Sequence, residues 1–176
     1  MRLFIAINFD EKTKQNMVNV QQRLQELGQG HFSRPENLHL TLAFLGEVPS
    51  ARVAAVRNAM DLVTVRPMNL TFESLGSFKR DDGDIWWIGI AENTALLSLQ
   101  TALSDCLLAE GFVLESRRFS PHITLARGMH VSPQMDSSDL LAEPFSTCTN
   151  TISLMCSERI RGKLTYTEIY KQTAAH

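Results

Sequence analysis

Two stretches of the chain, NLHLTLAFLG (residues 37–46) and SPHITLARG (residues 120–128), carry one pattern: histidine, apolar residue, threonine, leucine, alanine. Both are typical of strands, and strand side chains alternate between two faces. The residues predicted to share the polar face are His39, Thr41 and Ala43 in the first stretch, and His122, Thr124 and Ala126 in the second. The opposite face carries Leu38, Leu40, Leu42 and Phe44 in the first, and Ile123 and Leu125 in the second. Each strand is therefore predicted to place one face on a core and the other on a polar ligand.

The residue types on the polar face suit proton transfer to a phosphate ester. Histidine, with an ordinary pKa of ~6.5, gives or takes a proton near neutrality. Two histidines facing one cleft can divide the roles of general acid and general base. The hydroxyl of a threonine two residues further on can donate a hydrogen bond to a phosphate oxygen. We interpret His39, Thr41, His122 and Thr124 as candidate catalytic residues; the alternative is two half-exposed strands with polar faces.

The sequence lacks the residue patterns that metal sites, nucleophilic catalysis and triphosphate binding require. A catalytic zinc usually takes three protein ligands, and neither motif has a carboxylate or thiol on its polar face. The three cysteines have no metal-like spacing, and RDDGD at residues 80–84 indicates a hairpin turn rather than a calcium loop. Neither a nucleophile elbow nor a triphosphate-binding loop is present. The sequence therefore predicts neither a metal nor a cofactor.

Composition limits the partners. The 176 residues are 44% hydrophobic and 20% charged, which is typical of a globular protein. There are 17 Lys and Arg against 19 Asp and Glu, a net charge of -2, with no dense basic run. That balance favours a small or terminal piece of nucleic acid over a long phosphate backbone. No window approaches the ~18 apolar residues of a membrane span, and the start is too short for a signal-peptide core. We expect a cytoplasmic protein without membrane association.

Hydrophobic periodicity predicts three helices. They begin near Asp10, Ser50 and Thr94, and glycines follow the first and third. The first is predicted to bury Met17, Val20, Leu24 and Leu27, the second Val53, Val56, Met60 and Val63, and the third Leu96, Leu99, Leu103 and Leu107. Strand-like runs cover residues 2–8, 39–44, 68–78, 84–91, 122–126, 146–156 and 163–171. Residues 131–144 are predicted to form a surface loop. This order predicts an α+β fold with mostly antiparallel sheets carrying helices on one side.

The motifs and their flanks resemble a known family. The resemblance rests on RLFIAIN (2–8), ENLHLTLAFLGEV (36–48), PHITLAR (121–127) and RGKLTYTEIYK (161–171). Together they are similar to the 2H phosphoesterase superfamily, and within it to the bacterial RNA 2',3'-cyclic phosphodiesterases, also called ATP-independent 2'-5' RNA ligases. The resemblance implies two pseudo-twofold related lobes within one domain over residues 1–176. Each lobe would hold an antiparallel sheet with packed helices and would give one motif strand to a central groove.

The resemblance also implies a reaction. RNA ends or short oligonucleotides with a 2',3'-cyclic phosphate would be opened to a 2'-phosphate, with His39 as proton donor and His122 as acceptor. Thr41 and Thr124 would hold the non-bridging oxygens. The same site would join RNA ends reversibly through a 2'-5' linkage without ATP, because the strained ring carries the energy. A monomer is expected. Two alternatives stay open: a phosphodiesterase for small cyclic phosphates or 2',5'-oligoadenylates, and a non-catalytic module that binds RNA ends.

Further residues are candidates for substrate contact. Arg127 follows Thr124 by three residues, where the family often has an arginine near the phosphate, and a guanidinium suits that anion. Strict alternation places Arg127 opposite His122, so a bulge or strand end is required. The candidates for base stacking are Trp86, Trp87, Phe9 and Tyr166. His31, His130 and His176 are interpreted as surface residues. RRFS at residues 117–120 departs from the family pattern and, with 131–144, is where preference for substrate length can differ.

Overall fold

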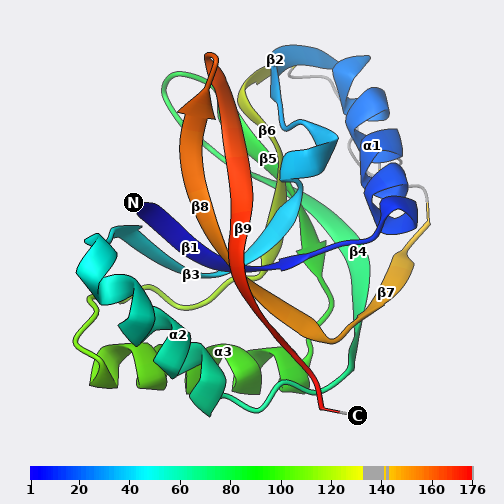
Figure 1. Ribbon diagram of the computed structural model, residues 1–176. Helices are drawn as coiled ribbons and strands as arrows, with labels where there is room; N and C mark the ends of the chain where they lie inside the picture. The colour runs from blue at the N-terminus through cyan, green and yellow to red at the C-terminus, as the bar shows by residue number, and fades with distance from the viewer. Residues whose placement is uncertain (133–140, 142, 176) are drawn as a thin grey trace.

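The described residues of the computed structural model, 1–132, 141 and 143–175, form two antiparallel β-sheets and three α-helices (Figure 1). The predicted α+β class with antiparallel sheets is confirmed. The first sheet has the strand order β3-β1-β8-β9, with β3 at His39–Glu47, β1 at Arg2–Asn8, β8 at Thr151–Ile160 and β9 at Lys163–Thr173. The second has the order β2-β6-β5-β4-β7, with β2 at Gly28–Phe32, β6 at His122–Val131, β5 at Asp84–Ile90, β4 at Met68–Phe78 and β7 at Phe145–Thr149.

The helices begin close to the predicted positions. In α1 (Glu11–Gln25), the Asp10 carboxylate accepts a hydrogen bond from the Thr13 backbone N–H at 2.8 Å, as a good N-cap does. The cap of α3 (Thr94–Ala109) is Asn93, one residue before the predicted Thr94, and it accepts from Leu96. The prediction for Ser50 was wrong, because Ser50–Arg52 forms a 3-10 turn and α2 (Val53–Leu62) begins after it.

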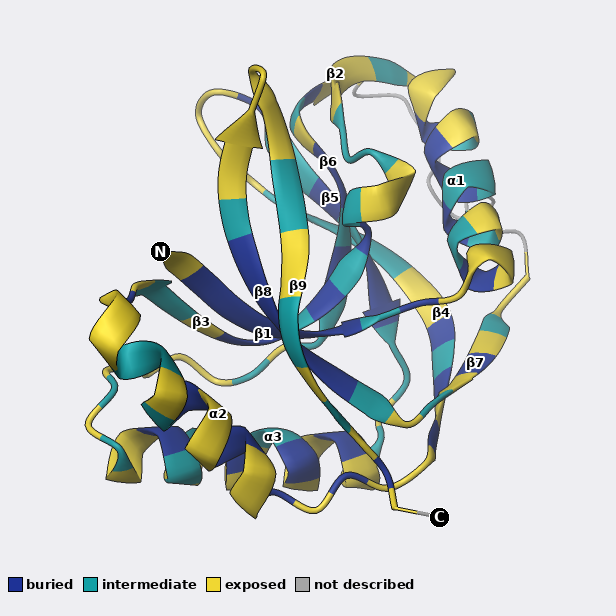
Figure 2. Cartoon of the chain, in the orientation of Figure 1, coloured by how far each residue is buried: buried dark blue, intermediate teal, exposed yellow. Residues whose placement is uncertain are grey.

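The apolar faces of the helices meet in a core shared by both sheets. The four leucines predicted to face inward from α3 are all buried, whereas Leu27 lies beyond α1 and is exposed. The largest buried cluster joins Leu3, Ile5 and Ile7 of the first sheet to Ile123 and Leu125 of the second. Figure 2 shows these buried segments converging where the sheets face each other. Within the described residues, no helix is long and apolar enough to cross a membrane.

Two segments of the chain repeat one plan, which gives the pseudo-twofold relation. In each, a strand leads to a helix, and the motif strand then returns antiparallel to that first strand: β1 and β3 around α1, and β5 and β6 around α3. The pairs at the motifs correspond. They are Asn8 with His39 and Ala6 with Thr41 in one segment, and Gly89 with His122 and Trp87 with Thr124 in the other. The helices are exchanged, since α1 packs on β6 and β7 while α3 packs on β3.

Other strand predictions were correct in position and wrong in detail. The run at 146–156 divides at Asn150 into β7 and β8. The strand β2 was not predicted, because its sequence GQGHF contains two glycines and was interpreted only as a helix stop. The hairpin turn at 80–84 is confirmed between β4 and β5. Most of the surface loop predicted at 131–144 lies outside the described residues.

Candidate active site

Each motif strand is irregular just after its threonine. The pairing of β3 with β1 shifts register between Thr41 and Ala43, and that of β6 with β5 shifts between Thr124 and Ala126. Such a β-bulge inserts one residue and reverses the alternation of side chains beyond it. Both alanines are therefore buried: Ala43 in the main core, and Ala126 against Trp86. The prediction that they share the polar face was wrong.

The residue that follows each alanine returns to the histidine side. These residues are Phe44 and Arg127, and both line the groove that holds the motifs. The prediction that Phe44 joins the apolar face was wrong, since its exposed fraction is 41%. The bulge that Arg127 requires is present. Phe44 and Arg127 each lie five residues after a motif histidine, so they occupy equivalent places in the two repeats.

A glutamine from the helix of each repeat braces the opposite bulge. Gln100 of α3 donates its side-chain amide to the Leu42 carbonyl at 3.3 Å, and Gln21 of α1 donates to the Leu125 carbonyl at 2.9 Å. Gln21 is buried and also donates to the Ser33 carbonyl at 2.8 Å. A bulge residue loses its place in the ladder, so an amide donor satisfies a carbonyl that would otherwise lack a partner.

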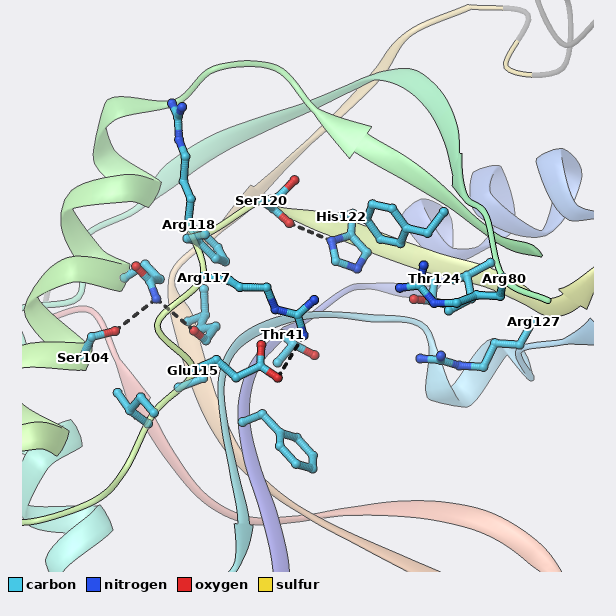
Figure 3. A pocket seen from close by; sticks show the side chains of 18 residues that line it. Thr41, Arg80, Ser104, Glu115, Arg117, Arg118, Ser120, His122, Thr124 and Arg127 are labelled. Carbon is cyan, nitrogen blue, oxygen red and sulfur yellow. Dashed lines mark hydrogen bonds and ion pairs between the residues drawn. The ribbon is translucent and has the colours of Figure 1, made fainter. Parts of the chain in front are cut away.

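The two motifs line one groove with two arms. The arms share Thr41, Phe44, His122, Thr124 and Arg127. The helix arm, of about 620 Å³, extends past Gln100 and Ser104 of α3 to residues 114–120 (Figure 3). The hairpin arm, of about 560 Å³, extends between residues 31–34 and the β8–β9 hairpin, and His39 lines it. The structure therefore brings together the five predicted site residues His39, Thr41, His122, Thr124 and Arg127.

The two imidazoles are held in the same way. The Nδ1–H of His39 donates to the Asn37 carbonyl at 2.7 Å, and that of His122 donates to the Ser120 carbonyl at 2.6 Å (Figure 3). A carbonyl oxygen only accepts, so Nδ1 carries a proton in both rings. The proton that can be exchanged is therefore the one at Nε2. The Nε2 of His39 lies 2.9 Å from the Thr41 hydroxyl.

The surroundings of the histidines differ. His39 lies between Phe4 and Tyr166, with ring centroids 4.9 and 5.2 Å away. Burial lowers the pKa of His39 below 6.5, and the charges of Arg127 and His122 lower it further, while the hydrogen bond to Asn37 raises it. His122 instead meets the edge of Phe78, with centroids 5.4 Å apart, and Trp87 at 6.1 Å.

Of the four aromatic residues predicted to stack on a base, two lie beside a histidine. Tyr166 adjoins His39 and Trp87 adjoins His122, and both are half-buried. The other two predictions were wrong, because Trp86 and Phe9 are buried in the core, where Phe9 packs edge-on against Phe72. Sequence reasoning missed Phe44 and Phe78 as groove residues. Their signal would have been the bulge after the motif and the pairing of β4 with β5.

Arginines far apart in the sequence converge on the groove. Those lining one or both arms are Arg2, Arg34, Arg80, Arg117, Arg118, Arg127 and Arg159. Among the described residues that line either arm, Glu115 is the one acidic side chain, and it pairs with Arg117 at 3.3 Å. The whole chain has a net charge of -2, so the positive potential is local to the groove. The sequence indicated this only through Arg127 and the RRFS stretch.

The remaining histidines lie outside the two motifs. His31 and His130 are exposed as predicted, although His31 lines the hairpin arm; His176 lies outside the described residues. In the described part of the chain, no three His, Cys, Asp or Glu side chains are grouped so that they could hold a metal ion. Metal-free catalysis stays a prediction.

The chain is similar to phosphoesterases in sequence and in fold. Residues 7–87 match the family described as LigT like Phosphoesterase. An RNA 2',3'-cyclic phosphodiesterase of Archaeoglobus fulgidus is 30% identical over 77% of each chain. The corresponding protein of Escherichia coli is 27% identical over 96% of this chain and 93% of its own. The apo crystal structure of Escherichia coli LigT superposes with a TM-score of 0.83 at 25% identity, covering 99% of this chain and 98% of that chain.

Proposed function

This chain belongs to the LigT-like family of 2H phosphoesterases, and from that premise we propose that it opens the 2',3'-cyclic phosphate at an RNA end to a 2'-phosphate. The observation that carries the proposal is the pair of His-x-Thr strands that meet in one arginine-lined groove. In both, a backbone carbonyl fixes Nδ1 and leaves Nε2 for proton transfer. The two arms, of about 620 and 560 Å³, favour an RNA end over a mononucleotide, because they offer space beyond the terminal nucleotide.

The proposed mechanism divides the work between the histidines. His122 takes the proton of the attacking water, and His39 gives its Nε2 proton to the leaving 3'-oxygen. Each such transfer typically contributes ~10²–10⁴-fold to the rate. The hydroxyls of Thr41 and Thr124 donate hydrogen bonds to the non-bridging oxygens, and Arg127 offsets the negative charge of those oxygens. Before attack, the Thr41 hydroxyl occupies the partner position at His39 Nε2, so substrate displaces an existing hydrogen bond.

The lowered pKa of His39 bears on the acid role. An acid must hold its proton when substrate is bound, and the burial of His39, together with the nearby charge of Arg127, works against that in the free protein. The phosphodiester is an anion, so its arrival opposes the electrostatic effect of Arg127 and His122 on the pKa of His39. We therefore propose that the bound anion raises the pKa of His39, that the ring then takes up a proton from solvent, and that His39 becomes a competent acid only in the complex.

Ligation follows from the same chemistry. When the 5'-hydroxyl of a second RNA strand takes the place of water, its oxygen attacks phosphorus and forms a 2'-5' linkage. The bond to the 3'-oxygen breaks in the same step. The strained ring supplies the free energy, so the proposed ligation needs no ATP.

We also propose that residues 1–176 act as a single monomeric domain.

The experiment that tests the function directly uses a short RNA ending in a 2',3'-cyclic phosphate. We expect full conversion to the 2'-phosphate in excess EDTA, because the proposed steps move protons and use no metal-bound water. Chromatography against 2'- and 3'-phosphate standards identifies the product. Activity that EDTA abolishes and a divalent ion restores would contradict the mechanism. Binding of the RNA without turnover would instead favour the non-catalytic alternative.

A further inference from the structure

We propose that the two arms of the groove hold different reactants. The hairpin arm holds the RNA strand that carries the cyclic phosphate, and the helix arm admits the nucleophile, which is water or the 5'-hydroxyl end of a second strand. This assignment rests on the proposed function and deepens it, because it names the residues of this chain that contact each strand.

The argument begins with the direction of attack. In an in-line displacement at phosphorus, the nucleophile enters opposite the leaving oxygen. Of the two arms, His39 lines the hairpin arm, and His39 is the proposed donor to the leaving 3'-oxygen. The ribose that bears this oxygen, and the strand attached to it, therefore lie in the hairpin arm. His122, the proposed base, borders both arms, so its nucleophile enters from the helix arm.

Hydrogen bonds fix one side of the hairpin arm, because they join β9 to the segment before β3. The Asn37 side chain donates to the Leu164 carbonyl of β9 at 3.0 Å, and the Arg34 guanidinium donates to the same oxygen. The backbone carbonyl of Asn37 also holds His39, so the β8–β9 hairpin is tied to the segment that orients the proposed acid. Figure 1 shows this hairpin projecting beyond the rest of its sheet.

The charge of the hairpin arm fits a single strand. Arg2, Arg34 and Arg159 line it. No acidic side chain of the described residues lines this arm, although Glu36, outside it, pairs with Arg34 at 2.9 Å. Tyr166 adds an aromatic ring on the same wall. Single-stranded RNA is bound by such combinations of cationic groups along the backbone and aromatic faces under the bases. The hairpin arm therefore offers both kinds of contact to the strand that is present in hydrolysis and in ligation.

The helix arm has arginines of its own, so it can receive the 5' end of a second strand. Figure 3 shows Arg117 reaching toward Thr41 while Arg118 points away from it. The ion pair with Glu115 offsets part of the Arg117 charge.

In ligation the P–O3' bond breaks and the P–O5' bond forms. The 5'-hydroxyl proton passes to His122, and the Nε2 proton of His39 passes to the 3'-oxygen.

Photocrosslinking locates the first strand without turnover. The probe is a short RNA that ends in a 2'-phosphate, the product of the reaction, with 4-thiouridine at the penultimate position. We expect crosslinks to peptides of residues 157–166 or 31–37. Crosslinks to residues 112–120 would overturn the assignment. Because the product binds without chemistry, this outcome is independent of the proposed catalysis, whose failure would show separately as no hydrolysis of the cyclic phosphate.

A pair of variants gives a second readout. Arg159→Ala should weaken the binding of the 2'-phosphate RNA about fivefold more than Arg117→Ala does, because it removes a charge from the arm that holds this strand. For an RNA with a 5'-hydroxyl end and no terminal phosphate, the order should reverse. Arg66→Ala is the matched control, since Arg66 is exposed between α2 and β4 and lines neither arm. Equal effects of both variants on both RNAs would overturn the proposal.

Discussion

The motif strands β3 and β6 share a backbone plan and differ in what surrounds it. Each follows a strand and a helix, each bulges after its threonine, and each histidine is held by the carbonyl two residues before it. Yet His39 is enclosed by Phe4 and Tyr166, whereas His122 borders both arms of the groove. At the equivalent place beyond the bulge, one strand carries Phe44 and the other Arg127.

This difference suggests how a repeated backbone can support an unequal pair. The shared features fix the positions of the two Nε2 atoms and the two hydroxyls. The unshared features act on His39, since burial lowers its pKa in the free protein. The phosphate can therefore lie between like groups whose surroundings differ.

The largest predicted effect comes from removing either histidine. His39→Ala and His122→Ala should each lower kcat for the cyclic phosphate by ~10² or more, because each removes one proton transfer. The double variant should lose less than the product of the two factors, since both act in one step. Steady-state kinetics with circular dichroism checks this, and His130→Ala, exposed outside both arms, is the control. A near wild-type rate for either single variant would remove that histidine from the mechanism.

A smaller effect should separate the equivalent residues Phe44 and Arg127. Arg127→Ala should lower kcat/KM about 10- to 100-fold, the loss expected for a hydrogen bond to a charged group. Phe44→Ala should cost only a few-fold, because an aromatic ring contributes packing and carries no charge. Arg127→Lys should recover only part of the loss, because lysine keeps the positive charge but lacks the planar fork of the guanidinium. Equal losses at Phe44 and Arg127 would show that the two repeats contribute alike.

The smallest predicted effect is on the pKa of His39, which can be measured by NMR of the histidine rings. The pKa of His39 should lie below 6.5, rise in Arg127→Ala, and rise again when a 2'-phosphate ligand binds. The unfolded chain then binds more protons than the folded one as pH falls below ~6.5. The contribution of His39 to the free energy of unfolding is therefore present above that pH and lost as the pH falls to the folded pKa. A pKa of His39 above 6.5 in the free protein would contradict this account.

Much of the fold could be predicted because its signals are local. The periodic leucines of α3, the cap at Asp10, the continuous apolar run of β1 and the alternation in β4 each depend on neighbouring residues. The strand β2 could not be predicted, since it lies at a sheet edge and its glycines lack strand propensity; its pairing with β6 decides its conformation.

The site was predicted as far as the two motifs and Arg127. The four histidine and threonine positions follow from alternation, but alternation fails at the bulge, which depends on pairing with another strand. For this reason Ala43 and Phe44 were assigned to the wrong faces. The arginines of the two arms come from β1, from β6, from the loops before β3 and β6, and from two hairpins. Only the packing of the two sheets brings them together.

The most direct test of the unequal pair uses a phosphodiester whose leaving group is a weak base and needs no proton. With this substrate a missing acid costs little, while a missing base still leaves the nucleophile inactive. We predict that His39→Ala turns over at close to the wild-type rate and that His122→Ala stays slower by ~10² or more. Rescue of His122→Ala with none for His39→Ala would reverse the roles and the assignment of the two arms. Rescue of neither would contradict general acid catalysis by His39.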